Sequence, residues 1–133
     1  MSGESQEGLK MRKSINDTTL ACSSFIKVKH MVGTANWKPN GYSSWKQFWE
    51  DKSSLKFPSK TEKCACCHED TNPDDFVGSH IYEVADKNKM YIYPICNDCN
   101  LRYREGKEGS TEFEVKKVRC VTFQESDYYV ETS

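Results

Sequence analysis

Four cysteines arranged as two Cys-x-x-Cys pairs constrain the fold of this chain more than any other feature of its sequence. The pairs are Cys64 with Cys67 and Cys96 with Cys99. A Cys-x-x-Cys turn points both sulfur atoms at one centre, and two such turns complete the closed, four-coordinate geometry of structural zinc, with zinc–sulfur distances of about 2.3 Å. The spacing therefore predicts one structural zinc ion, with no coordination position left for a substrate.

Other potential zinc ligands lie close to the first pair. The run from Cys64 to His68 reads Cys-Ala-Cys-Cys-His, so Cys66, His68 or the more distant His80 could replace one cysteine. We favour Cys64 and Cys67 because only these two have the knuckle spacing, and Cys66 is then a free thiol or a contact of the ligands. A redox site is disfavoured, since a thioredoxin-type protein has one such motif at a strand-to-helix junction of a larger fold.

Length and composition indicate a small globular protein. The chain has 133 residues, of which 36% are hydrophobic and 29% charged, so it can bury a modest core. It has no apolar run of about 18 residues and no secretory signal at its polar N-terminus. We therefore expect a cytoplasmic, reducing setting without membrane contact, in which the seven cysteines are metal ligands and free thiols rather than disulfides.

The charges are distributed unevenly along the chain. Residues 8–60 carry ten Lys and Arg against three Asp and Glu, whereas residues 61–133 carry nine against fifteen. A basic half suits phosphate groups or an acidic partner, but two oppositely charged halves can also complement each other within one fold.

Three regions are expected. Residues 1–17 predict a flexible tail or a short helix. Residues 18–60 predict a strand at 19–30, where apolar and basic residues alternate, followed by an aromatic helix packed on the zinc region. Residues 61–133 predict the zinc domain with C-terminal strands.

The aromatic helix is predicted at residues 45–52. Ser44 and Gln47 form a capping-box pattern at its start. Aromatic residues then recur at helical spacing, at Trp45, Phe48 and Trp49. Such a stripe is more typical of a buried core than of a surface that contacts bases or a partner protein, so we expect it to be buried.

Between the two cysteine pairs the pattern predicts a β-hairpin. Segments at 76–84 and 90–95 have strand composition and flank a polar turn at 85–89. A short helix is expected at 100–105, with Cys99 in its first turn. A zinc knuckle, a hairpin, a second knuckle and a helix in this order predict an α+β fold, namely a small treble-clef zinc finger.

The C-terminal part predicts further strands. Residues 111–123 alternate as one or two strands, with Val118 and Cys120 on one face after a slip of phase. Residues 124–133 predict an edge strand or a frayed end. Cys22 and Cys120, isolated in strand-like segments, are expected to be small buried hydrophobic residues.

The sequence also resembles the HNH endonuclease superfamily over about residues 62–105. The matching segments are Cys64-Ala65-Cys66-Cys67, Gly78-Ser79-His80-Ile81 and Pro94-Ile95-Cys96-Asn97-Asp98-Cys99-Asn100. The resemblance implies that His80 is a general base, which activates water beside a divalent ion such as Mg²⁺ on the scissile phosphate. Histidine suits this role because its ordinary pKa of about 6.5 lets it accept a proton at neutral pH.

The resemblance implies that the divalent ion is held by an Asp or His just before the catalytic histidine and by a His or Asn on the following helix. Here Ser79 stands where the Asp or His should be, and the helix has Asn100, Arg102 and Arg104 but no histidine. Serine is a poor ligand for a hard cation, and arginine is no ligand at all. His80 is alternatively a structural residue, packed beside the zinc knuckle and hydrogen-bonded to a backbone carbonyl or an acid.

The function that we expect is a zinc-stabilised binding module for DNA, RNA or an acidic protein, without a complete catalytic centre. Its predicted contact residues are basic side chains of the last helix and the hairpin turn, Arg102, Arg104, Lys87 and Lys89. These charges could instead form a solvated face. Two other functions stay open, an HNH-type endonuclease that uses His80 and a zinc-stapled inhibitor or adaptor. The sequence does not predict the oligomeric state.

Overall fold

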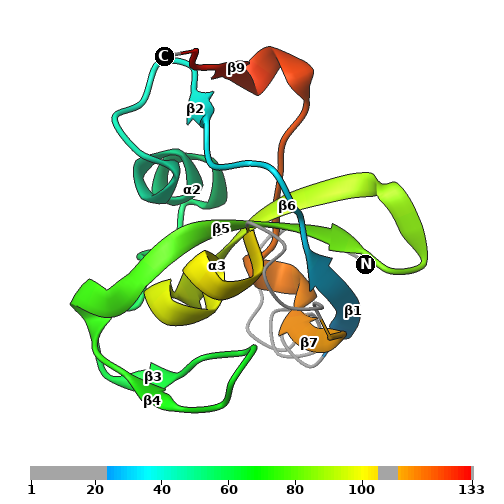
Figure 1. Cartoon of the computed structure of the whole chain (residues 1–133). Coiled ribbons are helices and arrows are strands. Elements are labelled where there is room, and N and C mark those ends of the chain that lie inside the picture. The colour runs from blue at the N-terminus through cyan, green and yellow to red at the C-terminus, as the bar shows by residue number, and fades with distance from the viewer. Residues whose placement is uncertain (1–23, 105–110, 133) are drawn as a thin grey trace, which may run out of the picture.

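The computed structural model describes residues 24–104 and 111–132 (Figure 1). The predicted N-terminal tail or helix and Cys22 lie outside the described residues. The described part is a mixed α+β fold with two helices and antiparallel strands, which confirms the predicted fold class. No helix in this part is both long and apolar enough to span a lipid bilayer.

A five-stranded antiparallel sheet forms the centre of the fold, with the strand order β7-β1-β5-β6-β8. Its strands are β1 (Phe25–His30), β5 (Phe76–Glu83), β6 (Asp86–Cys96), β7 (Phe113–Lys116) and β8 (Val121–Thr122). The long β5–β6 hairpin lies between the two cysteine pairs in the sequence, as predicted. Because β1 pairs with both β5 and β7, the segment that precedes the cysteines belongs to the same sheet as the hairpin.

Two short ribbons and two helices complete the described fold, and Figure 1 shows their arrangement around the sheet. The ribbons pair β2 (Trp37–Pro39) with β9 (Tyr128–Val130) and β3 (Glu62–Lys63) with β4 (Asp70–Thr71). The helices are α2 (Trp45–Ser53) and α3 (Asn97–Arg104), and 3₁₀ turns cover Pro73–Asp75, Lys117–Arg119 and Glu125–Asp127. The predicted C-terminal edge strand is therefore β9.

Helix α2 begins at the predicted cap. The backbone N–H of Gln47 donates to Ser44 Oγ at 3.1 Å, which satisfies one of the N–H groups that a helix start leaves without a partner. The buried residues of α2 are Trp45, Phe48 and Trp49. The expectation that the aromatic stripe belongs to the core is confirmed.

The sheet separates two apolar clusters, because successive side chains of a strand point to opposite faces. On one face, the His80 ring of β5 contacts Trp45 of α2. On the other face, Ser79 of β5 bonds to Asn100 of α3. The cluster under α2 contains Trp45, Phe48, Trp49, Phe57, Phe76, Ile92, Val121 and Phe123. The cluster on the side of the cysteines contains Val28, Cys64, Ile81, Tyr91, Tyr93, Ile95, Cys96, Cys99, Phe113 and Val115.

Two elements have different bounds from those predicted. β6 begins at Asp86, so the hairpin turn is shorter than the predicted 85–89 segment and consists of Val84 and Ala85. The polar residues after the turn extend the strand beyond the core. α3 begins at Asn97 rather than at residue 100, and it still places Cys99 in its first turn.

The prediction of Val118 in a strand is wrong. The slip of phase after β7 is a 3₁₀ turn at Lys117–Arg119, and Val118 lies in that turn with 38% of its surface exposed. Alternation resumes only in β8, where Val121 is buried. A three-residue turn and a one-residue bulge produce the same change of phase in the sequence, so periodicity alone does not distinguish them.

Candidate metal centre and the cleft beside it

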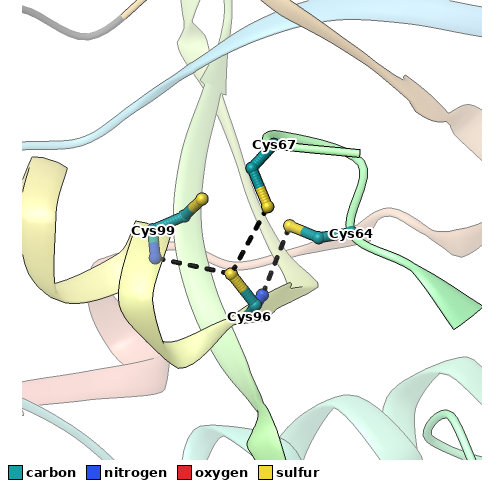
Figure 2. A group of neighbouring side chains, drawn as sticks. All are labelled: Cys64, Cys67, Cys96 and Cys99. Carbon is teal, nitrogen blue, oxygen red and sulfur yellow. Dashed lines mark hydrogen bonds between the residues drawn. The ribbon is translucent and has the colours of Figure 1, made fainter. Parts of the chain in front are cut away.

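The two cysteine pairs converge in space (Figure 2). Cys64 and Cys67 lie in the turn between β3 and β4, Cys96 ends β6, and Cys99 lies in the first turn of α3. The four Sγ atoms all lie within 4.8 Å of one another. The fold therefore brings together the four residues with knuckle spacing.

The arrangement of the sulfur atoms fits a tetrahedral metal ion. Four sulfurs that each lie about 2.3 Å from one zinc ion are about 3.8 Å apart. The Sγ atoms of Cys67 and Cys96 are 3.8 Å apart. Four sulfur ligands suit zinc, whereas magnesium and calcium prefer oxygen. Among the described residues this is the one group of three or more His, Cys, Asp or Glu side chains with such close ligand atoms.

Backbone N–H groups donate to the sulfurs. The N–H groups of Cys66 and Cys96 donate to Cys64 Sγ at 3.4 and 3.5 Å, and that of Cys99 donates to Cys96 Sγ at 3.5 Å. Burial raises the pKa of the Cys64 thiol, but hydrogen bonds from the backbone of Cys96, Cys67 and Cys66 and from the Cys96 side chain together outweigh burial and hold its pKa below the ordinary value. Hydrogen bonds to sulfur favour the thiolate, which is the form that binds a metal ion.

Burial has the larger effect on the second pair. It raises the pKa of the Cys96 and Cys99 thiols well above the ordinary value. Four thiolates in this largely buried cluster would repel one another without a compensating charge, and a divalent cation supplies that charge. The site is therefore better suited to a bound metal ion than to four free thiols.

Cys66 and His68 lie outside the group of four. Cys66 is half-buried, and burial raises the pKa of its thiol to about 11. The His68 side chain is exposed, and its backbone, at φ 64°, closes the turn by donating its N–H to the Cys64 carbonyl at 2.8 Å. The structure favours the predicted ligand set over these alternatives.

His80 lines a cleft of about 430 Å³. Its ring is 5% exposed and contacts the rings of Trp37, Trp45 and Phe123, with centroid distances of 5.7, 4.7 and 5.3 Å. Its Nε2 has no hydrogen-bond partner in the described part of the chain. Burial lowers the pKa of His80 to about 3, with a further contribution from the Arg104 charge, so the ring is neutral at neutral pH.

The other walls of the cleft combine apolar residues with basic and polar ones. Its charged and amide side chains belong to Lys38, Lys46, Arg104, Asn97 and Asn100. None of the described lining residues is Asp or Glu. Thr34 also lines the cleft, is 2% exposed, and has an Oγ1 atom without a hydrogen-bond partner among the described residues.

Sequence reasoning missed three of these residues, Thr34, Lys38 and Lys46. They come from the loop between β1 and β2, from β2 and from α2, and no motif links them. The fold brings them to the cleft through contacts such as that of the Gly33 N–H with the Arg104 carbonyl, at 2.8 Å. The excess of basic residues in the first half of the chain was the only signal in the sequence.

Ser79 and Asn100 are bonded to each other. Ser79 Oγ donates to Asn100 Oδ1 at 2.8 Å and lies 3.5 Å from His30 Nδ1. His30 packs between the rings of Tyr103 and Phe113, both at 5.0 Å, and burial lowers its pKa to about 4. The positions where the HNH resemblance would place metal ligands are thus a neutral hydroxyl and a neutral amide.

The four predicted contact residues do not line one hollow. Arg104 lines the cleft. Arg102 lines a second hollow of about 350 Å³ beside the cysteine cluster, together with the acidic residues Glu69, Asp70, Asp75 and Asp98. Lys87 and Lys89 are exposed near the hairpin turn. Asn97 lines both hollows, so the cleft adjoins the candidate metal centre.

No protein-family model, no curated protein and no solved structure matches this chain. The resemblance to the HNH superfamily over residues 62–105 stays a prediction. The function has to be inferred from the geometry of the cysteine cluster and of the adjoining cleft.

Proposed function

We propose that this protein is a zinc-stabilised module that binds nucleic acid through the cleft beside its metal centre. The zinc ion would join the β3–β4 turn to the end of β6 and the start of α3. These elements support the cleft residues His80 of β5, which pairs with β6, and Asn100 and Arg104 of α3. The metal then contributes folding free energy and fixes the cleft without entering it.

The charge of the cleft carries this proposal. Lys38, Lys46 and Arg104 line it, and its described lining contains no carboxylate. Proteins bind the phosphate backbone chiefly with lysine and arginine. The partly exposed Trp37 adds aromatic surface to the same walls, and aromatic side chains stack on bases of single strands. A concave site of this size is better suited to a phosphate and its base than to a flat protein interface.

The order of the elements supports a treble-clef interpretation of the zinc domain. A cysteine pair in a turn precedes the β5–β6 hairpin, and the second pair lies at the junction of β6 and α3. This is the arrangement that the HNH resemblance implies. We therefore propose that the zinc domain is related to the HNH superfamily.

A second candidate function, HNH-type phosphodiester hydrolysis, is favoured by His80. A neutral imidazole in a basic cleft can accept a proton from water. However, a pKa of about 3 makes His80 a weak base. No described residue of the cleft offers a carboxylate for the divalent ion that this chemistry uses. Binding is therefore the better-supported function.

Salt-dependent binding of labelled DNA and RNA, measured by fluorescence anisotropy, tests the proposal. The double variant Lys38→Ala/Lys46→Ala should weaken binding and reduce the slope of log affinity against log salt by about one for each phosphate that is no longer neutralised. The variant Lys87→Ala/Lys89→Ala removes the same charge outside the cleft and is the matched control. Equal effects of the two variants, or no binding of DNA or RNA at low salt, would contradict a nucleic-acid site in the cleft.

Plasmid nicking separates the second candidate from the first. Cleavage in the presence of Mg²⁺ that disappears in His80→Ala would establish the endonuclease. If the chain neither cleaves nor binds nucleic acid, and a pull-down with the chain instead recovers a protein partner, the adaptor function is correct and the binding proposal is wrong.

A further inference from the structure

We infer that the cleft binds a phosphate oxyanion directly, through hydrogen-bond donors and basic side chains, without a bridging divalent cation. The inference rests on the proposed function and specifies how the cleft recognises its ligand. It distinguishes this chain from a protein in which a metal ion holds the phosphate. Four features of the cleft lead to it.

The first feature is the orientation of the Asn100 amide. Asn100 Oδ1 accepts the hydroxyl hydrogen of Ser79 at 2.8 Å. Asn100 also lines the cleft. Because Oδ1 is bonded to Ser79, the amide nitrogen Nδ2 is the atom with which Asn100 would bind a ligand there. An amide nitrogen donates hydrogen bonds only. Ser79 therefore makes Asn100 a donor towards the cleft.

The second feature is a pair of buried polar atoms without partners. Thr34 Oγ1 and His80 Nε2 have no hydrogen-bond partner in the described part of the chain, and both residues line the cleft. A buried polar atom without a partner costs free energy, so such atoms commonly mark a bound group or water. The Thr34 hydroxyl can donate a hydrogen bond, and His80 Nε2 donates one in the tautomer that carries the ring proton on Nε2.

The third feature is the distribution of charge. Lys38, Lys46 and Arg104 line the cleft, and Arg104 is close enough to His80 to act on it electrostatically. Three positive charges attract a phosphate and repel a divalent cation.

The fourth feature is the lack of ligands for a hard cation. Magnesium and calcium take oxygen ligands, most often carboxylates. The described lining residues include no Asp or Glu, and the side-chain oxygen of Asn100 already accepts a hydrogen bond from Ser79. The cleft is therefore suited to an anion. A terminal phosphate of a nucleic-acid strand and an internal phosphodiester would both supply a phosphate oxyanion.

Tryptophan fluorescence provides the test, because Trp37 and Trp45 line the cleft. The zinc-loaded chain is titrated, in buffer free of magnesium, with inorganic phosphate and with one single-stranded DNA in 5′-phosphorylated and unphosphorylated form. We expect saturable binding of phosphate that added Mg²⁺ does not strengthen. Tighter binding of the 5′-phosphorylated strand would indicate a terminal phosphate, and equal binding an internal one. No binding of phosphate, or binding that requires Mg²⁺, would overturn the inference.

Isosteric variants identify the donors. Asn100→Asp keeps an acceptor for Ser79 but replaces the donor with a negative charge, and should weaken phosphate binding by roughly tenfold or more. Asn97→Asp introduces the same charge at an exposed position of the same cleft and should weaken binding several-fold less. Zinc content is measured for each variant, so that loss of the metal centre is recognised. Wild-type affinity in Asn100→Asp, or equal losses in the two variants, would contradict the assigned donor.

Thr34→Val gives a readout that a purely structural role would not produce. The substitution removes an unpaired hydroxyl at nearly constant volume, so it should leave stability unchanged or higher. It should nevertheless weaken phosphate binding. Undiminished phosphate binding in Thr34→Val would count against the donor set.

The two proposals fail in different ways. If nucleic acid binds but inorganic phosphate does not, this inference is refuted and the proposed function stands. If phosphate binds but nucleic acid does not, the proposed function is refuted.

Discussion

Replacing Gly78 with alanine should destabilise the fold by forcing α2 away from β5. A Cβ atom at this position would lie 2.8 Å from the Trp45 carbonyl carbon, 2.9 Å from Trp45 Cβ and 3.0 Å from the Lys46 nitrogen. Two of these atoms belong to the backbone at the start of α2, so no rotation of a side chain relieves the contact. The helix or the strand has to move.

The sign of the effect depends on which of two terms is larger. Alanine in place of glycine reduces the entropy of the unfolded chain, which stabilises a protein by about 0.4–1 kcal/mol where the new side chain fits. Overpacking in a close-packed core costs about 1–3 kcal/mol. Three contacts at or below 3.0 Å leave no room for the new carbon, so overpacking dominates. The net expected loss is about 1–2 kcal/mol, roughly a five- to thirtyfold fall in the ratio of folded to unfolded protein.

Urea unfolding of the zinc-loaded chain, followed by tryptophan fluorescence, measures this loss. Gly41→Ala is the comparison, because a Cβ there meets nothing within 4 Å although the backbone has φ 81°. It reports the cost of backbone strain without a steric clash. Since α2 carries Trp45 and Lys46 into the cleft, Gly78→Ala should also weaken phosphate binding. Unchanged or increased stability in Gly78→Ala would refute the close approach of α2 to β5.

Three further predictions concern the core and its titratable groups. Trp49→Phe removes the Nε1 donor that bonds the Arg119 carbonyl at 2.8 Å and should cost about 1–3 kcal/mol in the same assay, so a loss of less than half of that would contradict this bond. His30 and His80 have pKa values lowered to about 4 and about 3, so only the unfolded chain binds their protons between about pH 6.5 and 4. Unfolding free energy should therefore fall with pH below about 6.5, by up to 1.4 kcal/mol per pH unit for each histidine, and His80→Gln should reduce that slope while zinc content is monitored. Glu62→Gln breaks the 2.8 Å ion pair with Arg119, but both side chains are about one-third exposed, so the loss should stay below about 1 kcal/mol.

The parts of the fold that could be predicted from sequence are those with a local signal. Cys-x-x-Cys spacing identified the four residues that converge, because the geometry of a metal site restricts the spacing of its ligands. The cap at Ser44 and the aromatic stripe predicted α2 within one residue of its observed end. Strand composition on both sides of a polar turn likewise placed the two strands of the hairpin.

The cleft was not predictable, because it is assembled from distant segments. Thr34 and Lys38 lie about 40 residues before His80 in the sequence, and Arg104 lies after it. A lysine in a sequence carries no indication of whether it faces solvent or a cleft. Arg102 and Arg104 are two positions apart on α3, so they point in different directions, and the structure places them in separate hollows.

The environment of His80 shows a similar limit. Its position on a strand was predicted, but its contacts with three aromatic rings depend on α2, β2 and the segment after β8. The short-range sequence indicated a histidine near the knuckle with a hydrogen bond. Long-range packing produced a neutral ring whose Nε2 has no hydrogen-bond partner among the described residues.

Zinc X-ray absorption spectroscopy of the purified chain, combined with metal analysis, tests the central claim most directly. The account predicts about one zinc ion per chain with four sulfur neighbours at about 2.3 Å, and loss of one sulfur neighbour or of folding in Cys64→Ser. A stably folded chain without metal, or a zinc shell that contains nitrogen or oxygen in the wild type, would contradict it.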